Sequence, residues 1–201
     1  MVIWGIYYAA AMVTAGALAA WLLGWPAGIP FYLLALFCLY FFRDPERRIP
    51  TGGVAVSPAD GKIVGVVADQ AGAHRVSIFL NIFDVHVNRA PIAGKIACIQ
   101  YQKGRFLAAS KEQASHSNEQ NIITVQGDGT RVVFKQIAGL IARRIVCYKK
   151  VGDIVEAGER VGLIKFGSRV DVFLGPEWEV TVRAGERVAA GSSILARRRA
   201  A

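Results

Sequence analysis

Charged side chains are missing from the first 42 residues of this 201-residue chain. All 24 Lys and Arg residues and all 15 Asp and Glu residues therefore fall within residues 43–201. Such a division predicts two parts with different surroundings. We expect residues 1–42 to anchor the chain in a membrane and residues 43–201 to form a folded domain.

Cysteine pairs and metal-binding patterns are also missing. The three cysteines, Cys38, Cys98 and Cys147, are far apart and form no C-x-x-C pair. This spacing argues against a disulfide framework and against a zinc site, so we expect reduced thiols and no metal. The sequence also lacks the aromatic, zinc-finger and helix-turn-helix motifs of nucleic-acid binders. We therefore do not expect the protein to bind nucleic acid.

The uncharged part holds two apolar runs. Residues 2–23 are long enough to cross a bilayer as a helix, and the Gly- and Pro-containing residues 24–28 then break it. Residues 29–42 are short for a spanning helix, so a re-entrant or interfacial position stays open. We expect a helical hairpin; the alternative, a cleaved signal peptide, needs a basic residue ahead of the apolar run, and none is present.

Basic residues follow the second run directly. Arg43, Arg47 and Arg48 mark the cytoplasmic side of a membrane segment, so we expect the domain on the cytoplasmic side of the cell's inner membrane. The net charge of +9 suits attraction to an anionic phospholipid surface. A merely solvated basic surface explains the charge as well.

Residues 43–201 are rich in short β-branched runs with a period of two. Examples are KIVGVVA (62–68), HRVSIFLNIF (74–83) and GKIACIQYQ (94–102), with turn residues between them. The pattern predicts a mainly β domain, either a flattened barrel or a sandwich. Residues 136–144 alone have helical spacing, and Gly139 weakens that prediction.

An internal repeat adds detail to this fold. VGDIVEAGERVGLI (151–164) and RAGERVAAGSSILA (183–196) share the order glycine, acid, any, Val, any, Ala, glycine. The motif resembles the hairpin corners of lipoyl and biotinyl carrier domains. Two such corners are expected here, and Gly191-Ser192-Ser193 belongs to the second as a structural turn.

A second glycine-serine pair, Gly167-Ser168, lacks such an explanation. It lies after the first repeat, between two runs that look like strands. A serine hydroxyl can attack the preceding glycine carbonyl and turn the amide into an ester. β-Elimination then leaves dehydroalanine, which hydrolyses to a pyruvoyl group and ammonia. Glycine tolerates the backbone strain of this attack, but the dipeptide alone is common in ordinary turns.

Its surroundings are more specific. GLIKFGSRVDVFL (162–174) resembles the self-processing site of the phosphatidylserine decarboxylase family. Further stretches resemble the short prokaryotic members in the same order: FFRDPERRIP (41–50), SPADGKIVGV (57–66), IFLNIFDVHVNRAPIAGKI (78–96) and QIAGLIARRIVCY (136–148). The resemblance covers nearly the whole chain after residue 40.

The resemblance implies an enzyme that converts phosphatidylserine to phosphatidylethanolamine in phospholipid biosynthesis. It implies cleavage at Gly167-Ser168 into a β chain (1–167) and an α chain (168–201) that stay together. Ser168 would become a covalent pyruvoyl group, the cofactor that forms a Schiff base with the substrate amine. Expected partners are phosphatidylserine and the membrane; a homo-oligomer and the type of lipid chain are left open.

Self-processing needs a base for the serine proton, and the chain has three histidines. His86 lies in FDVHVNR, which matches an Asp-x-His segment of the family, and is preferred over His74 and His116. A carboxylate should orient the imidazole. Asp60 is the first candidate, from the resemblance, and Asp84 the second, because it would share a strand face with His86. Structural roles for His86 and Asp60 are the competing interpretations.

One position departs from the family pattern. Many members carry a second histidine three residues after the first, where this chain has Arg89. The resemblance assigns the base role to that second histidine in many members, so here either His86 takes over or processing uses another base. Arg89 is then expected to bind the carboxylate or phosphate of the substrate. Asn88 beside it, and Asn118 and Asn121 in a loop that partly matches the family, are further substrate-binding candidates.

Two other functions compete with this interpretation. One is a membrane-tethered adaptor with the same β fold and no catalysis, although a carrier lysine between methionines is missing. The other is a decarboxylase relative that no longer cleaves itself, motivated by Arg89. A denaturing gel distinguishes both from the enzyme, because only the enzyme splits into two chains.

Overall fold

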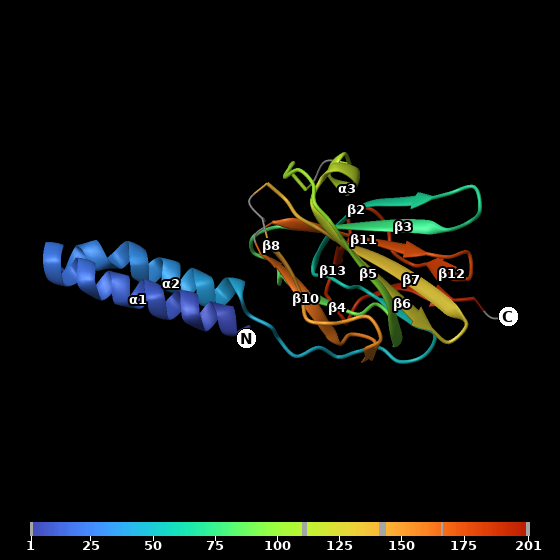
Figure 1. Ribbon diagram of the computed structural model, residues 1–201, viewed down its shortest axis with the longest axis horizontal. Coiled ribbons are helices and arrows are strands. Elements are labelled where there is room, and N and C mark those ends of the chain that lie inside the picture. Colours follow the sequence, from blue (N-terminus) through green and yellow to red (C-terminus); the bar gives the residue numbers. More distant parts are fainter. Residues whose placement is uncertain (1, 110–111, 141–143, 166, 200–201) are drawn as a thin grey trace. The chain divides into compact units, whose positions relative to one another are not determined.

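The computed structural model describes residues 2–109, 112–140, 144–165 and 167–199, which fall into two compact units (Figure 1). The first unit is Met1–Glu46 and the second is Arg47–Ala201.

The first unit is a hairpin of two apolar helices. It consists of α1 (Ile3–Leu23), the 3-10 turn η1 (Trp25–Gly28) and α2 (Ile29–Phe41). By length and composition, α1 can cross a membrane, whereas the apolar stretch Trp25–Phe41 is shorter. The expected helical hairpin is therefore confirmed.

Glycines let the two helices of the hairpin approach each other closely. A Cβ on Gly16 would lie 2.8 Å from the ring of Tyr32, and a Cβ on Gly28 would lie 2.8 Å from the Gly16 carbonyl oxygen. Small residues at such contacts are typical of helix pairs that pack in lipid. The outer surface of the pair is apolar, with Trp21 and Leu23 about 80% exposed.

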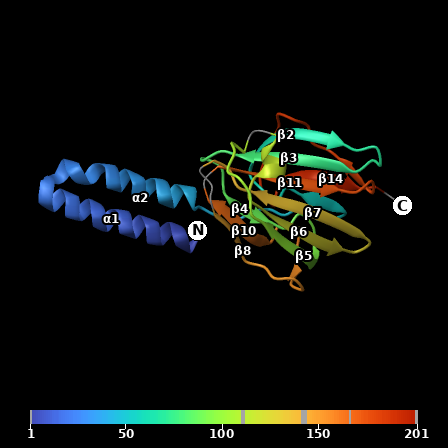
Figure 2. The same cartoon turned by 45° about the horizontal axis from the view of Figure 1, so that its top comes forward.

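The second unit is built from antiparallel strands, as Figures 1 and 2 show. Its largest sheet has eight strands in the order β13, β2, β3, β11, β7, β6, β5, β9, flanked by the three-stranded sheets β1-β14-β12 and β4-β10-β8. The expected mainly β fold is confirmed. The bounds are β1 Val54–Val56, β2 Gly61–Ala68, β3 His74–Leu80, β4 Val87–Arg89, β5 Gly94–Gln102, α3 Ala114–Ser117, β6 Gln120–Gly127, β7 Thr130–Ile137, β8 Arg144–Cys147, β9 Ile154–Val155, β10 Arg160–Lys165, β11 Ser168–Leu174, β12 Trp178–Val180, β13 Arg187–Val188 and β14 Ile194–Arg198.

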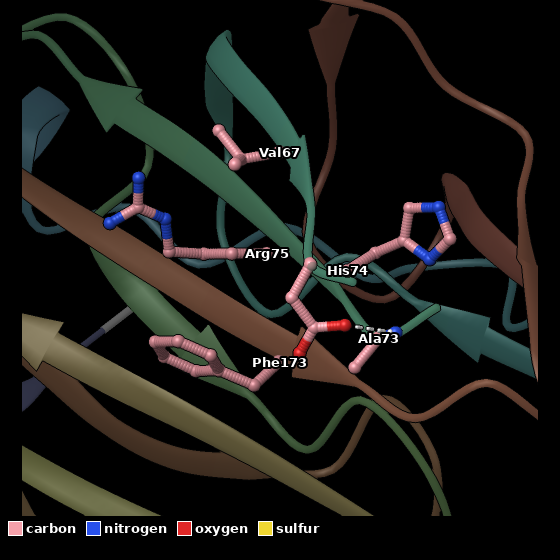
Figure 3. A pocket seen from close by; sticks show the side chains of 6 residues that line it. Val67, Ala73, His74, Arg75 and Phe173 are labelled. Atoms are coloured by element: carbon pink, nitrogen blue, oxygen red, sulfur yellow. Dashed lines mark hydrogen bonds between the residues drawn. The ribbon is translucent and has the colours of Figure 1, made fainter. Parts of the chain in front are cut away.

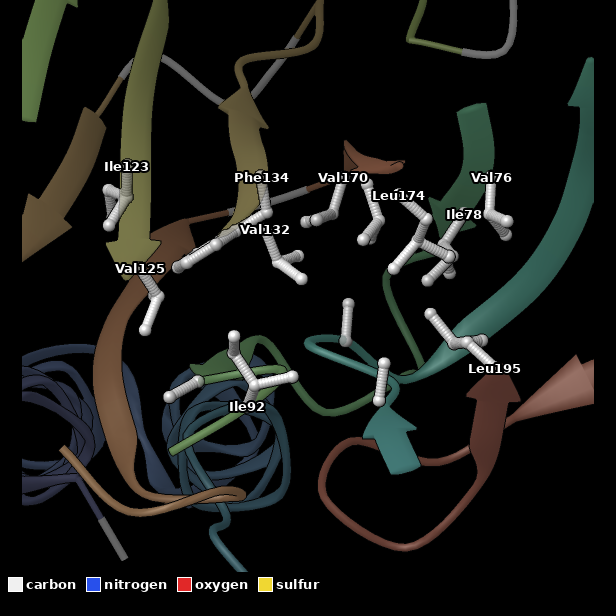
Figure 4. Close-up of a cluster of buried hydrophobic side chains, with 14 of the residues drawn as sticks. Val76, Ile78, Ile92, Ile123, Val125, Val132, Phe134, Val170, Leu174 and Leu195 are labelled. Carbon is white, nitrogen blue, oxygen red and sulfur yellow. The ribbon is translucent and has the colours of Figure 1, made fainter. Parts of the chain in front are cut away.

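The sheets enclose one apolar core (Figure 4). Strand β11 shows how the period-2 pattern builds it: Val170, Val172 and Leu174 enter the core cluster. The alternate residues of the strand, among them Arg169 and Asp171, lie on the opposite face. Ser168 begins the strand on the same face as the core residues.

The sequence repeat is reproduced in the backbone. Gly152 and Gly185 have φ of +99° and +98°, and Gly158 and Gly191 have φ of +76° and +75°. These left-handed conformations favour glycine, which explains why both corners carry glycine at the same spacing. Ile49 packs on both, since a Cβ on Gly158 or Gly191 would lie 2.4 or 3.0 Å from its Cδ1.

Two local predictions were wrong. Residues 136–144 form no helix where they are described: β7 ends at Ile137 and β8 begins at Arg144, while residues 141–143 lie outside the described part. Asp84 and His86 do not share a strand, because Asn81 closes a turn there and β4 begins only at Val87.

Candidate active site

Strand register gathers several loops at one end of the second unit. Ser168, the first residue of β11, pairs with Leu80, the last of β3, and Arg169 pairs with Ile137, the last of β7. Val87, the first residue of β4, pairs with Leu163 near the end of β10. The ends of β3 and β7 and the turn before β4 therefore lie close to the Gly167-Ser168 bond.

The Gly167-Ser168 pair has unusual geometry and surroundings. Gly167 has φ of +57°, and a Cβ there would meet nothing within 4 Å, so the conformation and not the space demands glycine. The Ser168 side chain is fully buried, and its Oγ has no hydrogen-bond partner among the described residues. A buried hydroxyl without a partner costs free energy, which calls for a functional reason.

His86 lies directly at this pair. Its Nε2 is 3.2 Å from the Gly167 backbone nitrogen, and its Nδ1 is 2.9 Å from the Asp84 carbonyl oxygen. The Gly167 N–H can only donate, so Nε2 must accept, and Nδ1 carries the proton donated to Asp84. These partners assign the tautomer: the basic lone pair of a buried imidazole points at the residue before Ser168.

The two carboxylate candidates lie differently. Asp84 is next to the imidazole, but its backbone carbonyl makes that contact; its carboxylate accepts the Asn81 N–H at 2.9 Å and pairs with Arg187. Asp60 binds Arg47 through both oxygens at 2.9 Å and accepts the Ala190 N–H at 2.8 Å. The catalytic roles of Asp60 and Asp84 stay predictions.

Arg89 lies at the corner of the first repeat. It is buried, and its guanidinium donates to the Gly158 carbonyl at 3.0 Å. A Cβ on Gly191, in the second corner, would lie 3.1 Å from its Cδ. The arginine thus connects the two corners, and a substrate contact would have to be made beside these structural ones.

The three asparagine candidates are also buried and bonded to protein groups. Asn88 accepts from Gln136 and Asn121 donates to Gln136, each at 2.9 Å, so the three amides form a chain. Asn118 donates to the Leu107 and Ala138 carbonyls, both at 2.8 Å. Their substrate-binding role stays a prediction, since it requires these bonds to be exchanged.

Gly139 is a site residue that the sequence did not reveal. A Cβ at this position would lie 2.1 Å from the Gly167 carbonyl oxygen and 3.3 Å from Ala109. The Gly167 carbonyl is the group that Ser168 would attack. Because Gly139 has no side chain, it leaves space for that carbonyl. A single glycine in an apolar sequence gives no sign of such a role.

We expect Gly139→Ala to slow self-cleavage by about 100-fold, because a methyl group at 2.1 Å must displace the reacting carbonyl, and displacements near 1 Å have effects of that size. A time course on denaturing gels measures the rate. Gly65→Ala is the control, since its Cβ would meet only Ser77 at 4.0 Å. Equal cleavage of both variants would contradict this role for Gly139.

An ionic network, buried except for Glu112, lies on the other face of β11. Arg169 Nε donates to Asp171 at 2.6 Å, and its terminal nitrogen reaches Ser77 at 2.8 Å and Glu112 at 3.0 Å. Ser115 in α3 donates to Asp171. The network fastens residues 112–115 onto the strand that begins with Ser168.

The charges in this network stabilise each other. Burial alone would raise the pKa of Glu112, but hydrogen bonds from Arg169 and Arg75, together with their charges, lower it below its ordinary value. Burial would lower the pKa of Arg169, while the Asp171 hydrogen bond and charge raise it. Both groups are therefore held in their charged forms.

A separate pocket of about 250 Å³ lies by the β2–β3 hairpin (Figure 3). It is lined by Val67, Asp69, Ala73, His74, Arg75 and Phe173. None of the predicted site residues lines it. Among the described residues, no cluster of three or more His, Cys, Asp or Glu side chains is placed to hold a metal ion.

Comparison with known proteins agrees with this geometry. Residues 34–196 match the family model described as phosphatidylserine decarboxylase. A phosphatidylserine decarboxylase proenzyme of Solibacter usitatus is 68% identical over 194 residues, covering 96% of this chain and 95% of that relative. Proenzymes of the same name from Syntrophus aciditrophicus and Ralstonia nicotianae are 48% and 45% identical, over 85% and 96% of this chain and 84% and 90% of those relatives.

A buried serine after a glycine of positive φ, where a histidine accepts the glycine N–H, fits an enzyme that is made as a precursor and processes itself. The names of the relatives, each a proenzyme, define the same class. The chain belongs to the phosphatidylserine decarboxylase family. The non-catalytic adaptor is accordingly not favoured.

Proposed function

We propose that this chain is a pyruvoyl-dependent phosphatidylserine decarboxylase that activates itself by cleavage at Gly167-Ser168. The observation that carries the proposal is the buried Ser168 hydroxyl, which has no partner among the described residues, directly after a glycine of positive φ whose N–H is bonded to His86. Family membership supplies the substrate class, since the relatives are phosphatidylserine decarboxylases by name.

His86 and Gly139 would act in the cleavage step. His86 Nε2 lets go of the Gly167 N–H and takes the Ser168 proton while Oγ attacks the Gly167 carbonyl carbon. As the C–N bond breaks, the imidazolium gives this proton to the departing Ser168 nitrogen, and an ester joins the two residues. Gly139 leaves the carbonyl free to move as its carbon becomes tetrahedral. Loss of the Ser168 α-proton then expels the Gly167 carboxylate and ends the β chain at that residue.

The residues present suit a pyruvoyl group derived from Ser168. The position is buried at the first residue of β11, between β3 and β7, which holds a new chain end rigidly in place. Such a group supplies an electron sink for decarboxylation. We assign Arg89, Asn88, Asn118 and Asn121 to the substrate site, with Asp60 and Asp84 as supporting carboxylates, in line with the sequence predictions.

The proposal is tested by incubating the purified full-length chain with phosphatidylserine and measuring phosphatidylethanolamine formed. Intact mass under denaturing conditions should show a β chain 1–167 and an α chain 168–201 that resists Edman sequencing. A freshly purified, active preparation that contains only the full-length chain would refute the cleavage step.

We further propose that the domains divide after residue 42 and that residues 1–42 hold the enzyme on the inner membrane, with the catalytic domain on the cytoplasmic side. The apolar helix α1 is long enough to cross a bilayer, and Arg43, Arg47 and Arg48 follow the hairpin. Arg47 itself belongs to the second unit, where it pairs with Asp60.

Deleting residues 1–42 should give a domain that still cleaves itself but turns over bilayer phosphatidylserine poorly. The reason is that the apolar core of the second unit is complete without those residues. Gel analysis of cleavage and turnover on vesicles measure the two effects. Failure of the truncated chain to fold would show that the two parts are not independent.

A further inference from the structure

Three large apolar side chains are exposed at the end of the second unit that holds Gly167 and Ser168. Ile82 is 37% exposed, Phe83 60% and Leu140 61%. Ile82 and Phe83 lie between β3 and β4, and Leu140 follows β7. We call Ile82, Phe83 and Leu140 the apolar rim.

The loop that carries Phe83 is held in shape by its own hydrogen bonds. The Asn81 side chain accepts the Phe83 N–H at 2.8 Å, and the Asp84 carboxylate accepts the Asn81 N–H at 2.9 Å. The Asp84 N–H closes the turn on the Asn81 carbonyl at 3.1 Å. The loop thus presents an aromatic ring to the outside in a fixed geometry, and grouped exposed apolar side chains mark interaction sites.

Two exposed cations lie at the same end. Lys62 pairs in register with Arg187 on one side and with Phe79, next to the last residue of β3, on the other. Lys62 is exposed, and the Arg187 side chain is 63% exposed while it pairs with Asp84 of the rim loop. Apolar side chains flanked by Lys and Arg are the combination that binds the interface of anionic membranes.

We propose that the apolar rim, together with Lys62 and Arg187, docks on an anionic phospholipid surface and so delivers the lipid headgroup to Ser168. This inference rests on the proposed function. The substrate headgroup lies at the interface of a bilayer, whereas Ser168 is fully buried, so the loops around the site must approach the lipid for the two to meet.

Charge favours a membrane over a second copy of the chain as the occupant. A symmetric contact through the rim would bring Lys62 of both copies together, and like charges at an interface are unfavourable. Phosphatidylserine carries a net negative headgroup, which Lys62 attracts, while the charge of Arg187 is balanced by Asp84.

The test uses the full-length chain in phosphatidylcholine vesicles and compares two substrates: long-chain phosphatidylserine in the bilayer and monomeric dihexanoyl phosphatidylserine in solution. The double variant Phe83→Asp/Leu140→Asp should cleave itself normally. Its turnover of the bilayer substrate should fall at least about tenfold, because charged side chains oppose insertion. Turnover of the soluble substrate should stay within about twofold.

Ile154→Asp is the matched control. Ile154 is 69% exposed and pairs with Lys95, whose other partner, Gln126, lies beside the β6–β7 turn at the opposite end of the sheet. This variant should process both substrates like the unchanged chain. Equal losses on both substrates in the rim variant, or no loss on either, would overturn the proposal.

A second measurement does not depend on activity. Tryptophan emission of a Phe83→Trp variant, read against the unchanged chain, should be quenched by brominated lipids, and that of Ile154→Trp should not. Absence of quenching would overturn the proposed membrane docking of the apolar rim, even if the enzyme is active. Quenching in a chain that decarboxylates neither substrate would support the docking and refute the proposed function. A change of oligomeric state in the double variant would assign the rim to self-association instead.

Discussion

We expect Ser168→Ala to leave the chain uncut and without decarboxylase activity. Alanine has no hydroxyl to attack the Gly167 carbonyl, so neither the ester nor the catalytic group derived from it can form. The substitution should be mild for the fold, since the Ser168 Oγ is buried with no hydrogen-bond partner among the described residues. A denaturing gel and an activity assay on the same preparation measure the two losses.

Ser192→Ala is the control for this result. Ser192 belongs to the corner of the second repeat, where its N–H donates to the Ala189 carbonyl at 3.1 Å, and the alanine backbone can make the same bond. That variant should cleave as the unchanged chain does. Cleavage of Ser168→Ala at any position near residue 168 would mean that another group is the nucleophile.

His86→Ala should stall the chain in its full-length form. A serine hydroxyl needs a base, and loss of a general base typically slows a reaction by about 10²- to 10⁴-fold, so cleavage over hours would take weeks or fail. His86 is the base candidate with a lone pair directed at Gly167. His74→Ala, in the separate pocket at the β2–β3 hairpin, should cleave normally.

Arg89→Ala distinguishes the role proposed for Arg89 in substrate binding from the role proposed for His86 as the base. Arginine stays protonated at working pH and cannot take the serine proton, so we expect cleavage to remain and lipid turnover to weaken. The band patterns of the three variants are compared after identical incubation. Prompt cleavage of His86→Ala combined with a stalled Arg89→Ala would reverse the assignment.

The features that sequence predicted best are those encoded locally. Period-2 runs gave the strands, the uncharged start gave the helical hairpin, and the spaced glycines gave both corners, because each depends on neighbouring residues. Ser168 could be selected because a glycine-serine pair interrupted a strand pattern in a recognisable context.

The features that sequence missed depend on register between distant strands. Gly139 lies against Gly167 only because β7 pairs with β11, and no local signal reports that contact. Asp84 turned out to orient His86 through its backbone, because the Asn81 side chain replaces the expected strand by a turn. The ionic network of Arg169 and Asp171 is hidden in the same way, since strand residues of this kind usually face solvent.

The strand order gives activation a lasting effect on how the protein can fold. The fragment after the cut carries β11, which lies between β3 and β7, β13, which borders β2, and β14, which lies between β1 and β12. The proposed cut of one peptide bond would therefore leave two chains interleaved in shared sheets. If heat pulls them apart, reassembly becomes a bimolecular encounter whose yield depends on concentration. The intact precursor folds as one molecule, whereas the separated chains of the mature enzyme must first associate in solution before the shared sheets can form again.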